Sequence, residues 1–100
     1  MDQLEREIQR GQSAADLLDN QVWRDTWTEY EAEIVDQLKR CPPRDAEGRE
    51  KLVLMLQMFA KFQAMVTETV QTGKLAAETL RQKSLREKAL GWIGRDGLTG

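Results

Sequence analysis

The sequence predicts an all-α protein, an antiparallel helical hairpin with a short N-terminal helix and a long third helix, that assembles into oligomers. Three observations support this fold class. Apolar residues make up 40% of the chain and charged residues 32%, with only two prolines, which suits helices that each carry one apolar stripe. Apolar positions recur at helical spacing along most of the chain. The two prolines are adjacent, so they divide the helical pattern at a single point.

The first helix is predicted over about residues 3–18. Its apolar positions are Leu4, Ile8, Ala15, Leu17 and Leu18. Gly11 lies in the middle and costs about 1 kcal/mol relative to alanine, so this segment forms either one weakened helix or two short pieces. Asp19-Asn20 follows and offers a side-chain oxygen that can cap the next helix.

The second helix is predicted over about residues 21–40. Its apolar stripe recurs at steps of 4, 3, 4, 4 and 3 residues: Trp23, Trp27, Tyr30, Ile34, Leu38 and Cys41. Pro42-Pro43 ends the helix, because proline lacks a backbone donor and disfavours helical geometry in the preceding residue. Two helices joined by so short a break are expected to lie antiparallel.

The third helix is predicted over about residues 46–90, with Asp45 placed to cap it. Steps of three and four residues alternate along its apolar seam, which is the pattern of a heptad repeat: Leu52, Met55, Phe59, Phe62, Val66, Thr69, Gly73, Ala76 and Leu80. Gly73 is expected to be a weak point in an otherwise continuous helix. Residues 1–90 therefore form a single helical domain.

Residues 52–59 are apolar almost all round the predicted helix, with a polar side only near Gln57. Such a stretch is expected to be buried on more than one side. Two arrangements remain open: the first and second helices pack on opposite faces within one chain, or a neighbouring subunit covers one face. Beyond this helix, residues 91–100 are predicted to form a glycine-rich flexible tail with a Trp92-Ile93 anchor.

Charge is unevenly divided along the chain. Residues 1–50 contain 13 acidic and 7 basic side chains, whereas residues 51–100 contain 4 acidic and 8 basic ones. The favoured interpretation is that acidic and basic faces lie side by side, within the fold or between copies. A basic segment that binds an acidic protein surface, or less favourably nucleic acid, is the alternative.

The composition argues against catalysis and against a cofactor or metal. Histidine is absent and Cys41 is the one cysteine, which removes the usual general base, the common nucleophile pairs and the usual zinc ligands. No phosphate-binding glycine loop is present. The N-terminus lacks a signal-peptide pattern, and the longest apolar run is interrupted by Gln57. We therefore expect no membrane association and a cytoplasmic location.

Two groups of residues are candidates for binding. The aromatic and apolar seam positions are expected to form the core and an oligomer interface: Trp23, Trp27, Tyr30, Leu52, Met55, Phe59 and Phe62. The basic C-terminal segment and the aromatic anchor are expected to contact a partner: Arg81, Lys83, Arg86, Lys88, Trp92 and Ile93.

Four short sequences give the chain a family resemblance: Leu17-Leu18-Asp19-Asn20, Pro42-Pro43-Arg44-Asp45, Gly48-Arg49-Glu50-Lys51-Leu52 and Thr72-Gly73-Lys74-Leu75. Through them the stretch 17–75 resembles small helical-hairpin proteins encoded by tailed bacteriophages and prophages. The resemblance implies a phage setting, in the host cytoplasm or the virion, and no particular chemistry.

The prediction for function is a non-catalytic phage protein that binds itself and another phage or host protein. The favoured role is virion assembly, as a scaffold, connector-associated or minor capsid component. The alternatives are a small inhibitor or regulator of a host protein, and a DNA-packaging accessory that contacts nucleic acid through its basic segment.

Overall fold

The computed structural model describes residues 2–99, with side chains described as far as Trp92, and within that range the chain is helical with no strand. The three helices are α1 (Gln3–Asp19), α2 (Gln21–Arg40) and α3 (Ala46–Thr99). The prediction of an all-α protein is thus confirmed. The helices begin within one residue of the predicted starts, and the one large difference is the end of α3.

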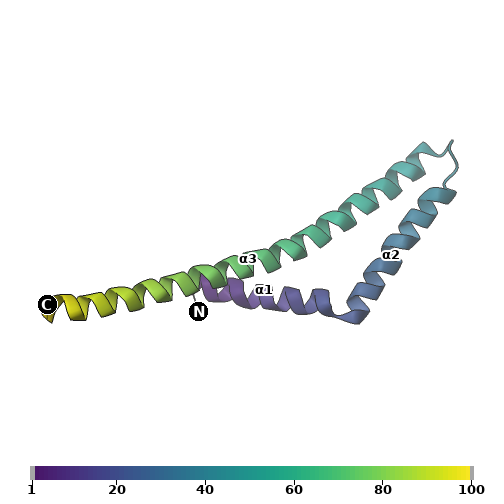
Figure 1. Cartoon of the computed structure of the whole chain (residues 1–100). Coiled ribbons are helices and arrows are strands. Elements are labelled where there is room, and N and C mark those ends of the chain that lie inside the picture. Colours follow the sequence, from purple (N-terminus) through teal and green to yellow (C-terminus); the bar gives the residue numbers. More distant parts are fainter. Residues whose placement is uncertain (1, 100) are drawn as a thin grey trace.

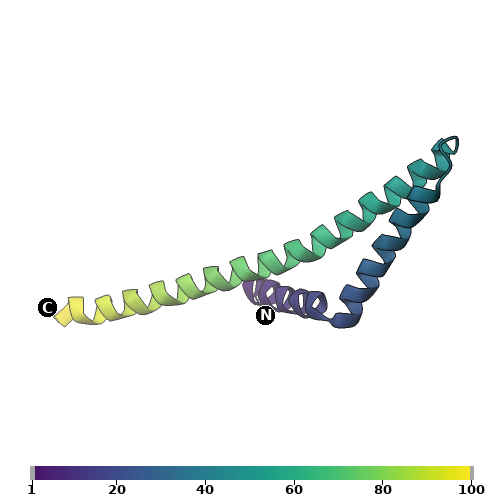
Figure 2. The ribbon, with the colours of Figure 1, turned by 45° about the vertical axis from the view of Figure 1, so that its right-hand side comes forward.

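The molecule is a long, thin rod. It measures 84 × 26 × 20 Å, and its radius of gyration is 23.2 Å, whereas a compact domain of this length has a value of about 13 Å. α3 spans the full length, and α1 and α2 lie against it one after the other (Figure 1). Figure 2 shows the same order from another side, with a sharp corner between α1 and α2 and with α3 running on past α1.

Each helix begins with a side-chain cap that satisfies an otherwise free backbone N–H group. The carboxylate of Asp2 accepts from the N–H of Glu5, and that of Asp45 accepts from the N–H of Gly48, both at 2.9 Å. The side-chain oxygen of Asn20 accepts from the N–H of Trp23 at 3.0 Å. The sequence offered Asp19 and Asn20 equally, and the structure assigns the cap to Asn20.

The Asn20 cap gives a first testable prediction. Asn20→Ala is expected to lower the free energy of unfolding by about 1 kcal/mol, because the N–H groups of the first turn of α2 lose their acceptor. Asp19→Ala serves as the control, since Asp19 is exposed at the end of α1 and is expected to change stability by less than about 0.5 kcal/mol. Urea unfolding followed by circular dichroism measures both, and equal losses would show that the corner is capped differently.

The contact between α1 and α3 depends on two glycines. Gly11 and Gly73 are both buried, and a Cβ added to either one would lie 2.7 Å from the Cα of the other. Two helix backbones can approach this closely only where neither residue has a side chain. α3 continues through Gly73, as predicted, and α1 is one helix through Gly11 instead of two short pieces. The close contact gives both glycines a packing role that the sequence did not indicate.

α2 contacts α3 through aromatic rings. The centroids of Trp27 and Phe59 are 3.9 Å apart in a stacked arrangement, and Trp23 lies 6.5 Å from Phe62. Tyr30 reaches Phe59 at 5.2 Å, so the contacts run in opposite order along the two helices. Ile34 of α2 is 2% exposed and Ala76 of α3 is 3% exposed. They are the two buried apolar side chains among the described residues.

One of the two arrangements left open for residues 52–59 is excluded, and the predicted tail is helical instead. α1 and α2 do not cover opposite faces of residues 52–59: the side chains beside α1 belong to the later part of α3, from Phe62 to Lys88. The predicted tail from residue 91 is also absent, because α3 runs to Thr99. Each added helical residue gains one hydrogen bond, and no glycine within 2–99 adopts the left-handed conformation that commonly ends a helix.

Candidate protein-binding surfaces

The seven residues predicted for a core or interface fall into two groups. Four are half-buried where α2 meets α3: Trp23, Trp27, Leu52 and Phe59. The other three, Tyr30, Met55 and Phe62, remain exposed, although the Tyr30 and Phe62 rings also contact the cluster. A core of two helices is too thin to enclose rings of this size. The seam is therefore part core and part surface.

Trp27 has an unusual position in this cluster. Its indole Nε1–H is buried and has no hydrogen-bond partner in the described part of the chain. The ring also lines a hollow of about 250 Å³ at the corner between α1 and α2, beside Leu18, Trp23 and Val66. A buried N–H without an acceptor costs about 1–3 kcal/mol. The ring packing must offset that cost.

An exposed apolar surface follows one side of α3. We call Leu54, Met55, Met58, Phe62 and Met65 the methionine stripe. The last four recur at steps of 3, 4 and 3 residues, which places them on one helix face next to the seam that α2 covers. Met58 is 71% exposed and Phe62 is 52% exposed. Methionine is flexible and polarizable, and it is frequent on surfaces that bind other proteins.

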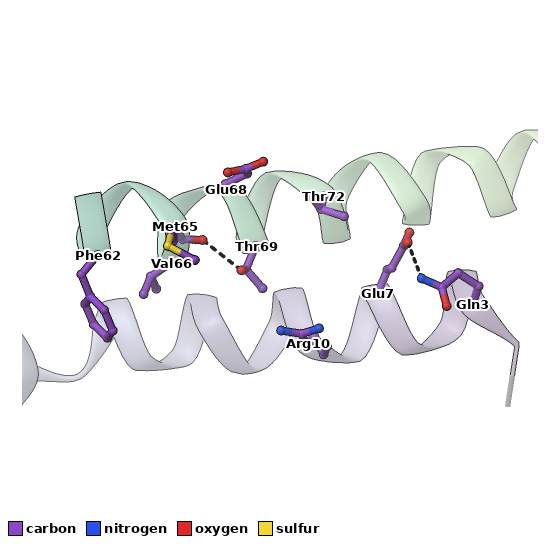
Figure 3. A pocket seen from close by; sticks show the side chains of 9 residues that line it. All are labelled: Gln3, Glu7, Arg10, Phe62, Met65, Val66, Glu68, Thr69 and Thr72. Carbon is purple, nitrogen blue, oxygen red and sulfur yellow. Dashed lines mark hydrogen bonds between the residues drawn. The ribbon is translucent and has the colours of Figure 1, made fainter. Parts of the chain in front are cut away.

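The methionine stripe leads into a groove between α1 and α3 (Figure 3). The groove has a volume of about 450 Å³. Phe62 and Met65, the last two residues of the stripe, lie at one end of it. Thr69 and Thr72 continue the α3 wall, and the hydroxyl of Thr69 donates to the carbonyl of Met65 at 3.0 Å. The α1 wall is polar: Gln3, Glu7 and Arg10 line it. Apolar surface thus meets a polar rim, as in many protein interfaces.

The chain exposes much more surface than a monomer of its mass normally does. Its accessible area is 8217 Å², whereas a compact monomer of 11.5 kDa exposes about 5,800 Å². The excess exceeds the total area that a standard protein interface buries, about 1,600 Å². The methionine stripe is an apolar part of this surface.

The predicted partner-binding residues lie where α3 runs past the N-terminal end of α1 (Figure 1). We call residues 81–92 the basic arm. Its basic side chains are exposed, and so are Leu85, Leu90 and Trp92. Ile93, the last predicted contact, lies outside the described side chains. Among the described side chains, those from Ala89 to Trp92 are all exposed.

One ion pair stands at the base of the basic arm. The Arg81 guanidinium donates to both carboxylate oxygens of Glu78, at 2.6 and 3.0 Å. These hydrogen bonds hold the pKa of Glu78 below its ordinary value of 4.5 and raise that of Arg81. A lowered carboxyl pKa stabilises the fold above pH 4.5, and this contribution is lost as the pH falls below that value. Lys83, Arg86 and Lys88 make no such pair in the described structure.

Sequence reasoning placed Gly73 and Ala76 in the seam of the third helix but did not predict that Gly11 packs against Gly73. All three residues are buried, yet small side chains carry little weight in an apolar pattern. Their signal was the seam itself, which passes through Gly73 and Ala76. Among the described residues, no three acidic or cysteine side chains gather closely enough to bind a metal ion. No described helix is long and apolar enough to cross a bilayer.

The described structure offers two surfaces: an apolar stripe with a polar groove, and a projecting basic arm. In comparisons with protein-family models, with curated proteins and with solved structures, nothing matched this chain.

Proposed function

We propose that this chain is a non-catalytic bacteriophage protein that binds other copies of itself and takes part in virion assembly, as a scaffold, connector-associated or minor structural component. The observation that carries the proposal is the exposed methionine stripe on a chain with about 2,400 Å² more surface than a compact monomer. The ring contacts between α2 and α3 leave that stripe uncovered. The phage setting rests on the resemblance of residues 17–75.

A second copy is the occupant that the stripe favours. Residues 52–59 are apolar on both sides of the seam that α2 covers. A helix from a partner on this face would bury the apolar side chains that α2 leaves exposed. Methionine and phenylalanine at heptad spacing suit packing against another helix of the same kind. Obligate assemblies of this sort share one core between subunits.

A charge placed on the methionine stripe tests this proposal. Met58→Glu is expected to weaken self-association at least tenfold, because a buried carboxylate without a partner is strongly unfavourable. The matched control is Gln57→Glu, which introduces the same charge at the neighbouring exposed position, about 100° round the helix. Light scattering across protein concentration gives the mass of each variant.

The wild-type mass decides between the roles. A mass well above 11.5 kDa that falls only in Met58→Glu supports the assembly role. A wild-type chain that stays at 11.5 kDa at every concentration and salt level contradicts it and favours the inhibitor role. Mass spectrometry of purified phage particles then tests the virion role, because an inhibitor of a host protein is expected to be absent from them.

A further inference from the structure

An acidic surface and a basic surface of this chain lie at opposite ends of the rod. We call Asp25, Glu29, Glu33 and Asp36 on α2 the acidic face, and all four are exposed. α2 packs beside the first part of α3, whereas the basic arm projects beyond the far end of α1 (Figure 1). Within one chain, the acidic face and the basic arm therefore cannot meet.

The ion pairs of the described residues confirm this separation. Each one joins two residues of the same helix: Asp36 with Arg40 in α2, Glu47 with Lys51 in α3, and Glu78 with Arg81 in α3. None links α2 to the basic arm. Pairing of the acidic face with the basic arm within one chain is thus excluded, and pairing between copies remains.

The exposed side of the basic arm is itself amphipathic. Arg81, Leu85, Lys88 and Trp92 recur at steps of 4, 3 and 4 residues, so they share one helix face. Leu85 is 52% exposed and Trp92 is 64% exposed, so half of this face is apolar and uncovered. At its base, Arg81, Leu85 and Lys88 help to line a hollow of about 400 Å³ beside Ile8 of α1. A helix of another protein chain can pack along such a face.

The acidic face has the matching form. Asp25, Glu29 and Asp36 are four and seven residues apart, on the side of α2 opposite Trp27 and Ile34. Val22 extends the same side and is 73% exposed. Every copy therefore exposes an acidic helix face with an apolar residue at one end. Its charge is opposite to that of the basic arm, and both surfaces carry exposed apolar side chains.

We propose that the basic arm of one copy packs on the acidic face of α2 in a second copy. The inference rests on the proposed self-association and names the partner of the arm. The two surfaces are different, so the contact is heterologous, and repeating it generates a ring or an open filament. Every copy then offers one arm and one acidic face. Arg81 and Asp36 already have an ion-pair partner in their own helix, whereas Lys88, Asp25 and Glu29 meet an opposite charge across the contact.

Charge reversal tests this contact with full-length chains. Arg81→Glu with Lys88→Glu reverses the arm face, and Asp25→Lys with Glu29→Lys reverses the acidic face. Each pair is expected to weaken the growth of the assembly at least tenfold at low salt. An equimolar mixture of the two is expected to restore it, because each reversed surface then meets a complementary one. The readout is the mass by light scattering.

A control separates this contact from general charge effects. The control is the double variant Lys83→Glu with Arg86→Glu. It changes the net charge as much as the arm-reversed variant does, but at positions on other sides of the same helix. Its mass is expected to stay within twofold of that of the wild type. Far-ultraviolet circular dichroism checks that every variant keeps its helices. If the control loses the assembly as fully as the Arg81 and Lys88 variant, or the mixture stays dissociated, the proposed contact is wrong.

Nucleic acid is the competing partner of the arm. A fluorescent DNA duplex is titrated with the wild-type chain and with the arm-reversed variant. If reversal abolishes DNA binding but leaves the mass unchanged, the arm contacts nucleic acid and the inference fails. The outcomes also separate the two proposals. A monomeric wild type overturns both proposals. An oligomer whose mass does not change with charge reversal or with salt overturns only the arm contact.

Discussion

Gly73→Leu is expected to detach α1 from α3 and to lower the free energy of unfolding by about 3 kcal/mol. A Cβ at this position would lie 2.7 Å from the Cα of Gly11 and 3.0 Å from the carbonyl oxygen of Glu7. Both are backbone atoms, so no side chain can rotate away, and α1 must move as a whole. Overpacking of this kind typically costs 1–3 kcal/mol, and here it adds to the loss of the packing along α1.

The same substitution at Gly91 is the matched control. Gly91 lies in the same helix, and a Cβ there meets nothing within 4 Å. Gly91→Leu is therefore expected to leave stability unchanged or to raise it by up to about 1 kcal/mol, because leucine favours a helix over glycine. Urea unfolding at one fixed protein concentration measures both variants, since association shifts apparent stability. Equal effects at the two positions would mean that α1 does not pack closely on α3.

Hydrogen exchange locates the damage. In Gly73→Leu, the amides of α1 are expected to lose protection, while those around Ile34 in α2 keep it. The prediction follows from the order of contacts along α3, where α1 and α2 pack on separate stretches. Loss of protection in α2 as well would show that α1 and α2 fold as one unit.

Local signals gave the helices reliably. The proline pair after Cys41 and the capping residue Asp45 fix a boundary whatever the rest of the chain does, and α2 occupies the predicted range 21–40. The long heptad pattern likewise indicated a continuous α3. Such signals depend on the backbone geometry of a few neighbouring residues, and the identity of those residues is enough to predict it.

The packing of the helices was harder to predict. The sequence shows that residues 52–59 are apolar all round but does not show which helix covers them. α1 is placed by the contact between Gly11 and Gly73, and a glycine in a helix also reads as a weak point. Two residues that are 62 positions apart share this contact, so neither indicates it alone.

The binding surfaces were predicted in part. The spacing of Met55, Phe59 and Phe62 identified an apolar seam, yet only a structure shows that α2 covers one side and leaves Met58 and Met65 exposed. The basic arm was visible as a charge pattern. Its separation from the acidic face was not, because the ends of a chain can lie together or apart depending on the fold.

Trp27→Ala is expected to lower the free energy of unfolding by about 3 kcal/mol. The Trp27 ring stacks on Phe59 at 3.9 Å and also contacts Phe62 at 5.7 Å. Its loss leaves Phe59 with only the Tyr30 ring and Phe62 with only the Trp23 ring as aromatic neighbours on α2. Because these ring contacts join α2 to α3, α2 is expected to loosen from α3 between Trp23 and Tyr30. Val22→Ala on the same helix is the control, and its exposed side chain predicts a change below about 0.5 kcal/mol.

Trp27→Phe distinguishes the ring from its N–H group. Phenylalanine keeps most of the stacking on Phe59 and removes the buried Nε1–H that has no acceptor in the described structure. Removing that group recovers about 1–3 kcal/mol of desolvation cost, which offsets much of the lost contact area. We therefore expect Trp27→Phe to cost less than about 1 kcal/mol in urea unfolding. If it costs nearly as much as Trp27→Ala, the Nε1–H donates to a group outside this chain, and the hollow beside Leu18 holds that group.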